Sequence, residues 1–139
     1  YHIACALPRR EINWIKSCPW YMHCASLNTL FVHAGFVAGL KLSRQNPRLM
    51  MNMGSILPDG TATAKHFSNW PWARLWDGPE TVIFGHDADR GLQLYSNAMG
   101  IDTGCVYGGR LTACVLPEKK LVSVSAKRQY LAFRPRKRG

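Results

Sequence analysis

Two stretches of this chain end in the same way, and they constrain the fold more than any other feature. Residues 29–35 read TLFVHAG and residues 81–87 read TVIFGHD, so each apolar run leads into a histidine flanked by small residues. Short apolar, β-rich runs predict buried strands. With short helical segments between them, they favour an α/β (α+β) fold, in which functional residues follow strand ends. His33 and His86 are therefore the first candidate site residues.

Neither histidine is decisive by itself, because a single histidine at a strand end is more often a hydrogen-bonded structural residue. The two also lie far apart in the chain, so their spacing adds no information. It is their matching contexts, beside residues small enough for a metal or phosphate to approach the backbone, that favour a shared site.

The remaining secondary structure is predicted from local patterns. Residues 110–116 and 120–126 form the clearest pair, two β-rich runs joined at Pro117 that predict a hairpin. Pro and Gly positions predict the other elements: a helix over residues 8–18, a helical turn or two within 44–53 from Pro47, a turn at 57–61, and a packed lid or helical turn at 69–76.

Size and composition indicate one modest globular domain. The chain has 139 residues, of which 47% are hydrophobic, and no run is long enough to cross a membrane. Its cysteine count of 5 is odd and no secretory signal is visible, so we expect reduced, mostly buried thiols in an intracellular protein. We expect the cytoplasm, with the nucleus left open by the basic end of the chain.

The formal net charge of +10 is unevenly distributed. Residues 127–139 contain six basic residues and no acidic one, so we divide the chain into a domain over 1–126 and a basic C-terminal tail over 127–139. Such a tail could bind phosphate backbones such as RNA, serve as an address, or simply be a solvated end. The smaller excess in the domain suits an anionic substrate.

A third cluster, residues 100–113, reads GIDTGCVYGGRLTA. Its glycines and the hydroxyl of Tyr107 could approach an oxyanion, although an irregular turn before the hairpin explains the pattern equally well.

Taken in order, LFVHAGF, VIFGHDADRGLQ and IDTGCVYGGRLTACVL resemble the C-terminal half of the ApaH-like phosphatases. These belong to the phosphoprotein-phosphatase branch of the calcineurin-like metallophosphoesterases. The resemblance covers about residues 11–130. It implies the C-terminal half of a four-layer β-sandwich flanked by helices and ending in a β-hairpin.

The resemblance also implies roles for four residues. His33 and His86 would bind the same divalent metal, while Arg74 and Tyr107 would contact the substrate phosphate. For Arg74, a surface position covering neighbouring tryptophans is an equally good reading. The segment GHDADRG echoes the family motif Gly-Asp-x-x-Asp-Arg-Gly, but it precedes the glycine-rich cluster, so its histidine matches the late metal ligand and DADRG reads as a chance echo.

The family's other metal motifs, Gly-Asp-x-His-Gly, Gly-Asp-x-x-Asp-Arg-Gly and Gly-Asn-His-Glu, do not occur in the chain. Two imidazoles without a carboxylate make a poor site for hard divalent metals. The resemblance implies a parent hydrolase with two divalent metals of the Mn, Fe, Zn or Mg class, manganese among them. That parent would cleave phosphoesters or phosphoanhydrides, such as dinucleoside polyphosphates or capped RNA, by metal-activated hydroxide. We expect the fragment alone to be inactive.

Two alternatives stay open at this point. The chain could be a non-catalytic basic module that binds nucleic acid, or a truncated copy without function. Because half of the implied sandwich is missing, we also expect open strand edges, exposed apolar faces and poor stability in isolation.

Overall fold

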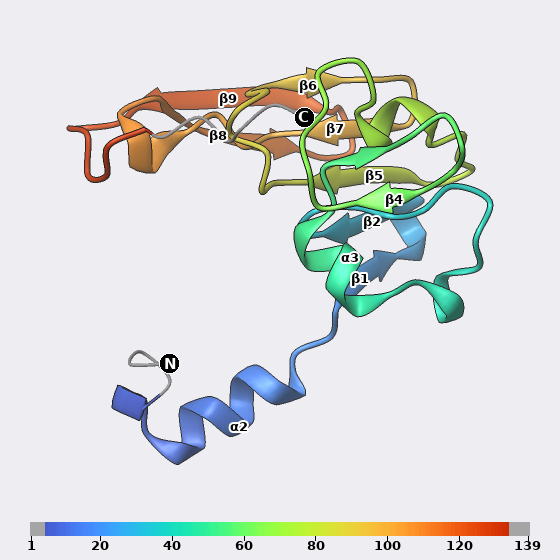
Figure 1. The fold of residues 1–139 in the computed structure, drawn as a ribbon. Coiled ribbons are helices and arrows are strands. Elements are labelled where there is room, and N and C mark those ends of the chain that lie inside the picture. Colours follow the sequence, from blue (N-terminus) through green and yellow to red (C-terminus); the bar gives the residue numbers. More distant parts are fainter. Residues whose placement is uncertain (1–4, 134–139) are drawn as a thin grey trace.

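The protein was analysed as a computed structural model, which describes residues 5–133. Its centre is a five-stranded mixed sheet with the order β1-β2-β5-β7-β6, accompanied by the two-stranded ribbons β3-β4 and β8-β9 (Figure 1). The strands are β1 Tyr21–Cys24, β2 Thr29–Val32, β3 Ser55–Ile56, β4 Ala62–Thr63, β5 Thr81–Phe84, β6 Gln93–Leu94, β7 Ala98–Gly100, β8 Arg110–Val115 and β9 Lys120–Ser125. The helices are α2 Arg9–Ser17 and α3 Pro47–Asn52, with 3₁₀ turns at Ala25–Leu27, Leu42–Arg44, Trp72–Leu75 and Cys105–Tyr107.

Three neighbouring strands of the central sheet run parallel to one another. β2 pairs with β5 in the register Val32↔Phe84, and β5 pairs with β7 in the register Phe84↔Gly100. All residues of β5 and β7 are buried, as expected for parallel strands that are covered on both faces. The C-terminal ends of β2, β5 and β7 therefore meet at one edge of the sheet, and the segments that follow them share that edge.

The core is built from this sheet and from aromatic residues of the connecting segments. Leu30, Val82 and Phe84 of the sheet pack with Phe36 and Trp72, all nearly inaccessible to solvent. The ring centroids of Trp72 and Phe84 are 4.8 Å apart. Large aromatic side chains provide most of the buried apolar area of a small core, so the segment 69–76 is packed structure rather than a free lid.

The elements predicted from the sequence are confirmed, with their ends shifted by up to three residues. The predicted helix over 8–18 is α2, although Pro8 caps it rather than beginning it. α3 begins at Pro47, and the side chain of Asn46 accepts a hydrogen bond from the Arg48 N–H, which is a standard N-terminal cap. The sequence did not predict β1, β3, β4, β6 or β7. The last four have only two or three residues each, and β1 reads YMHC, without a continuous apolar run.

The hairpin β8-β9 is also confirmed, but one of its faces has no cover among residues 5–133. Leu111 and Val124 lie directly opposite each other and are 61% and 63% exposed. Val115 and Val122 continue the same exposed apolar face. The opposite face is polar, with Arg110 donating hydrogen bonds to Ser123 and Ser125. An uncovered apolar face of this kind is typical of a surface that packs against further structure.

Helix α2 lies apart from the sheet (Figure 1), and none of its residues is buried. Its apolar side is therefore exposed, with Trp14 among the most exposed large residues. The expected free thiols are confirmed, but the expectation that they are mostly buried is wrong. Cys5 and Cys18 flank α2 and are exposed, and the other three are only partly buried. No helix within residues 5–133 has the length and apolar character needed to span a bilayer.

We expect the isolated chain to self-associate through the apolar face of the hairpin. Replacing Leu111 and Val124 by threonine should lower self-association several-fold in sedimentation velocity, because threonine keeps the β preference but removes apolar surface. The free energy of unfolding should change by about 0.5 kcal/mol or less, as at other exposed positions. The matched control is Leu121→Thr on the other face of β9. Equal self-association of the double variant and the unaltered chain would contradict this.

Candidate functional site

His33 and His86 lie side by side at the edge where the parallel strands end. His33 directly follows β2, and His86 follows β5 after Gly85. The Gly85 N–H donates to the carbonyl of His33 at 3.0 Å, which extends the β2-β5 pairing by one step. As a result the His33 Nε2 lies 3.1 Å from the His86 Nδ1, and the ring centroids are 5.0 Å apart.

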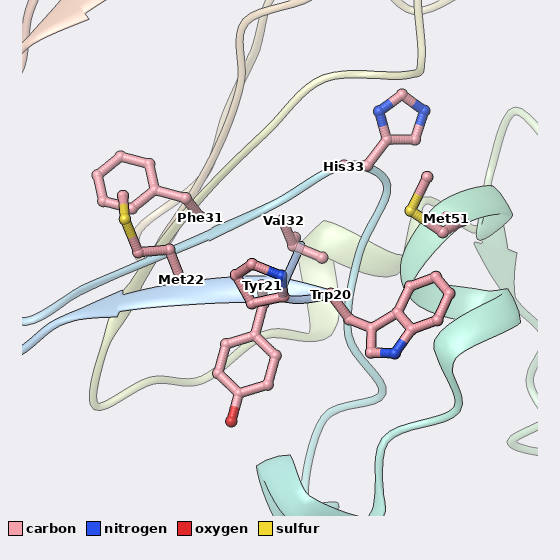
Figure 2. Close-up of a pocket in the computed structure, with 8 residues that line it drawn as sticks. Trp20, Tyr21, Met22, Phe31, Val32, His33 and Met51 are labelled. Atoms are coloured by element: carbon pink, nitrogen blue, oxygen red, sulfur yellow. The ribbon is translucent and has the colours of Figure 1, made fainter. Parts of the chain in front are cut away.

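The two rings differ in their surroundings. His33 is exposed, and Figure 2 shows its ring at the rim of an open apolar hollow, turned away from Met22 and Phe31. This hollow has a volume of about 320 Å³. His86 is half-buried and has a φ of +67°, a left-handed conformation that is uncommon for a residue with a side chain.

The distance between the two nitrogens fits two ligands of one metal ion. Metal–nitrogen bonds of about 2.0–2.1 Å place two ligands at right angles roughly 3 Å apart. A hydrogen bond between two neutral imidazoles has the same length. Residues 5–133 contain no group of three or more His, Cys, Asp or Glu side chains that could hold a metal ion. The pair is therefore a partial ligand set at most.

A buried charged cluster lies directly behind His86. Asp87 is 4% exposed, and its Oδ1 lies 3.0 Å from the Nδ1 of His66, which is buried as well. The guanidinium of Arg90 forms an ion pair with the Oδ2 of the same carboxylate, and Gln93 donates to that oxygen at 3.2 Å. The ring centroids of His66 and His86 are 6.0 Å apart.

The environment of Asp87 changes its proton affinity. Burial alone would raise the pKa of its carboxyl group. Hydrogen bonds from His66 and Arg90, together with the charge of Arg90, outweigh burial and lower the pKa from 3.8 to about 2. Asp87 is therefore a carboxylate at neutral pH, and its negative charge pairs with the guanidinium of Arg90 inside the cluster.

Arg74 lies on the exposed side of the 3₁₀ turn Trp72–Leu75. It lines a hollow of about 260 Å³ that includes neither candidate histidine; the other lining residues are Ile56, Asn69, Trp70, Pro71 and Leu75. This turn leads to the start of β5, whereas His86 follows the end of that strand. The phosphate role of Arg74 stays a prediction.

Tyr107 lies in the glycine-rich segment that follows β7, and this segment begins at the edge of the sheet where the two histidines lie. Its ring packs edge-on against Phe133, with the centroids 5.3 Å apart. The N–H groups of Tyr130 and Leu131 both donate to the carbonyl of Val106 at 3.0 Å, so the described part of the predicted tail folds back on this segment. The proposed phosphate contact of Tyr107 and the division of the chain at residue 126 stay predictions.

Comparison with known proteins identifies the relatives of this chain. No protein-family profile matches it. The bis(5'-nucleosyl)-tetraphosphatase PrpE [asymmetrical] of Oceanobacillus iheyensis is 31% identical over 129 residues, which are 91% of this chain and 50% of that protein. The PrpE of Anoxybacillus flavithermus is 30% identical over 128 residues, 86% of this chain and again 50% of that protein.

A crystal structure assigned as a diadenosine tetraphosphatase matches with a TM-score of 0.80 and 37% identity, over 89% of this chain and 58% of the other. The chain is related to the ApaH-like phosphatases. The resemblance inferred from the motifs and the mixed α/β fold are thus confirmed. The chain spans about half the length of the curated ApaH-like relatives that it matches.

The sequence patterns did not point to His66, Asp87 or Arg90. A signal was available, since Asp87 and Arg90 are three residues apart directly after His86. We read DADRG only as a chance echo of a metal motif. The structure shows that two of its residues form a buried ion pair.

Gly35 allows the segment after His33 to pack tightly on Trp72. A Cβ at Gly35 would lie 2.3 Å from Trp72 Cε2, whereas a Cβ at Gly85 would have its nearest neighbour, the His33 carbonyl, at 3.8 Å. We expect Gly35→Ala to lower the free energy of unfolding by about 1–3 kcal/mol, the usual cost of overpacking a core. The matched control Gly85→Ala should cost less. Equal losses in urea unfolding would contradict this packing.

The lowered pKa of Asp87 predicts a pH-dependent contribution to stability. The folded state binds this proton more weakly than the unfolded chain, so the carboxylate stabilises the fold above pH 3.8. That contribution is lost as the pH falls towards 2. The shift corresponds to about 2 kcal/mol.

The measurement compares Asp87→Asn with the unaltered chain in urea at pH values from 2 to 6. Their difference in unfolding free energy should shrink by about 2 kcal/mol on acidification. Asp59→Asn is the control variant. Asp59 is exposed, and its pKa is lowered chiefly by hydrogen bonds from Thr61 within the same turn. A difference that does not vary with pH would show that the charge of Asp87 contributes nothing.

Proposed function

We propose that this chain supplies the C-terminal part of a metal-dependent phosphohydrolase, in which His33 and His86 bind one of two divalent metal ions. The observation that carries the proposal is the 3.1 Å between the His33 Nε2 and the His86 Nδ1, at adjacent strand ends of a chain related to tetraphosphatases. Imidazole nitrogens suit iron and zinc, whereas manganese and magnesium also need carboxylate oxygens, and the ligands still needed would come from outside this chain.

The substrate class follows from the names of the relatives and from charge. We infer a phosphoanhydride such as a dinucleoside polyphosphate, with nucleotide-capped RNA ends and phosphoesters as further members of the class. Relatives named tetraphosphatases support the first of these. The net charge of +10 favours the approach of any such polyanion.

Bound divalent metals would supply Lewis acidity and a nucleophilic hydroxide for the hydrolysis. The residues of this chain would bind one metal ion and orient the substrate phosphates. The two imidazoles use neutral nitrogens as ligands, which requires both rings to be deprotonated at those atoms. The glycine-rich segment after β7 lies at the same edge, where Tyr107 would contact a phosphate oxygen. Arg74 lines a separate hollow, so it would contact a phosphate group further along the substrate.

The isolated chain should be inactive for two reasons. No carboxylate joins the two imidazoles in a metal-binding group within residues 5–133, so nothing in this part would fix a second metal. In addition, the apolar hollow beside His33 and the apolar face of the hairpin are open to solvent. We infer that the remaining half of the fold covers these surfaces and brings the other ligands.

The test is a hydrolysis assay with Mn²⁺ and diadenosine tetraphosphate. The 139-residue chain alone should show no turnover. Joining it to the N-terminal half of a PrpE relative, or co-expressing the two, should restore turnover. In that active form, His33→Ala and His86→Ala should each lower kcat/KM at least about 100-fold, as expected for loss of a metal ligand. His23→Ala is the matched control, since His23 lies exposed on β1 and should have no effect.

Turnover by the isolated chain would contradict the proposed division of the site. If the completed protein has no activity, while the chain alone binds RNA without metal and with strong salt dependence, the nucleic-acid-binding alternative replaces this proposal.

A further inference from the structure

His86 has a backbone conformation that its residue type does not favour. Its φ of +67° costs about 1 kcal/mol for a residue with a Cβ, so neighbouring structure has to maintain it. The Asp87 N–H donates to the Gly85 carbonyl at 2.7 Å, which closes a tight turn around His86. The Gly91 N–H donates to the Asp87 carbonyl at 3.2 Å, which forms a second turn directly after the first.

The residue next to His86 is fixed by charge as well as by packing. The carboxylate of Asp87 is buried and contacts His66 through one oxygen and Arg90 and Gln93 through the other. A buried carboxylate is costly to leave unpaired, so this side chain cannot leave its partners without a large loss of free energy. One peptide bond connects it to His86, and its position therefore limits where the His86 imidazole can go.

Arg90 connects the same loop by hydrogen bonds to a part of the chain that is distant in sequence. Its guanidinium donates to the carbonyl of Gly54 at 3.1 Å, to the Ser55 hydroxyl at 3.2 Å and to the carbonyl of Phe67 at 2.7 Å. The planar fork of an arginine offers five N–H donors from three nitrogens in fixed directions, whereas a lysine offers three donors from one nitrogen. The loop after β5 is thereby joined to β3 and to the segment that follows β4.

His66 completes the contact because Gly54 leaves room for its ring. A Cβ at Gly54 would lie 2.8 Å from the His66 Cδ2, so any side chain there would displace the ring. His66 itself is 6% exposed and is not accessible to a substrate. It contributes packing and a contact to Asp87 rather than chemistry.

We propose that Asp87, Arg90 and His66 form a positioning cluster, which holds the His86 imidazole beside His33 so that both nitrogens can bind one metal ion. The metal-binding purpose rests on the proposed function, whereas the geometric effect of the cluster does not. The three residues act through His86 and touch no substrate. Loss of such outer partners typically lowers metal affinity 10–100-fold.

The geometric effect can be measured in the 139-residue chain without metal. Nuclear Overhauser contacts between the ring protons of His33 and His86 report their 5.0 Å centroid distance. Asp87→Asn removes the charge at nearly constant shape, and Arg90→Lys keeps the charge but loses the fork. Both should weaken this contact strongly while the amide spectrum stays that of a folded chain. Asp59→Asn, at an exposed carboxylate in the turn between β3 and β4, is the control and should keep the contact.

A Zn²⁺ titration followed through the same ring signals gives the second measurement. We expect the affinity to fall about tenfold or more in Asp87→Asn and Arg90→Lys, and to change less than about twofold in Asp59→Asn. A His33–His86 contact that persists in both folded variants overturns the proposal. So does unfolding of both variants, because the cluster would then be a general requirement for the fold.

The same data separate this proposal from the proposed function. If the unaltered chain binds no Zn²⁺ while the ring contact is lost in both variants, the positioning cluster stands, and the hydrolysis assay of the completed protein decides the metal site. If Zn²⁺ binds equally well to every variant, the metal site stands and the positioning cluster is wrong.

Discussion

The candidate site depends on the parallel pairing of β2 with β5. This pairing aligns Val32 with Phe84, and the hydrogen bond from Gly85 to His33 continues it past the last residues of both strands. A shift of the register by one residue would turn one histidine to the other face of the sheet. Two side chains from distant parts of the sequence thus lie 3.1 Å apart because two short apolar strands pair in one particular way.

Around this pairing, the molecule is strongly ordered on one side and open on the other. Behind His86, the carboxylate of Asp87 and the guanidinium of Arg90 are buried and multiply bonded, which fixes the loop. Beyond His33 there is an open apolar hollow, and the hairpin also exposes an apolar face. These open surfaces belong to a chain that matches about half the length of its relatives.

The elements that sequence reasoning predicted were those with strong local signals. The apolar runs at residues 29–35 and 81–85, the hairpin, and the helix beginning at Pro47 each carry enough pattern in a short window to be read directly. Strands such as β3 and β6 have two residues each and exist only because a partner strand supplies their hydrogen bonds. The helix α2 was predicted as well, but a local pattern does not show what covers a helix, and none of the residues of α2 is buried.

By itself the sequence determined the mixed α/β character, the two histidines at strand ends and the relation to ApaH-like phosphatases, since these follow from short-range patterns and motif order. Only the tertiary structure decided that the two imidazoles meet, that Arg74 lines a different hollow, and that DADRG contains a buried ion pair rather than a mere echo of a metal motif. The reason is physical. Strand pairing and the burial of charge depend on residues tens of positions apart, such as Gly54 and Arg90, and these contacts leave no local trace in the chain.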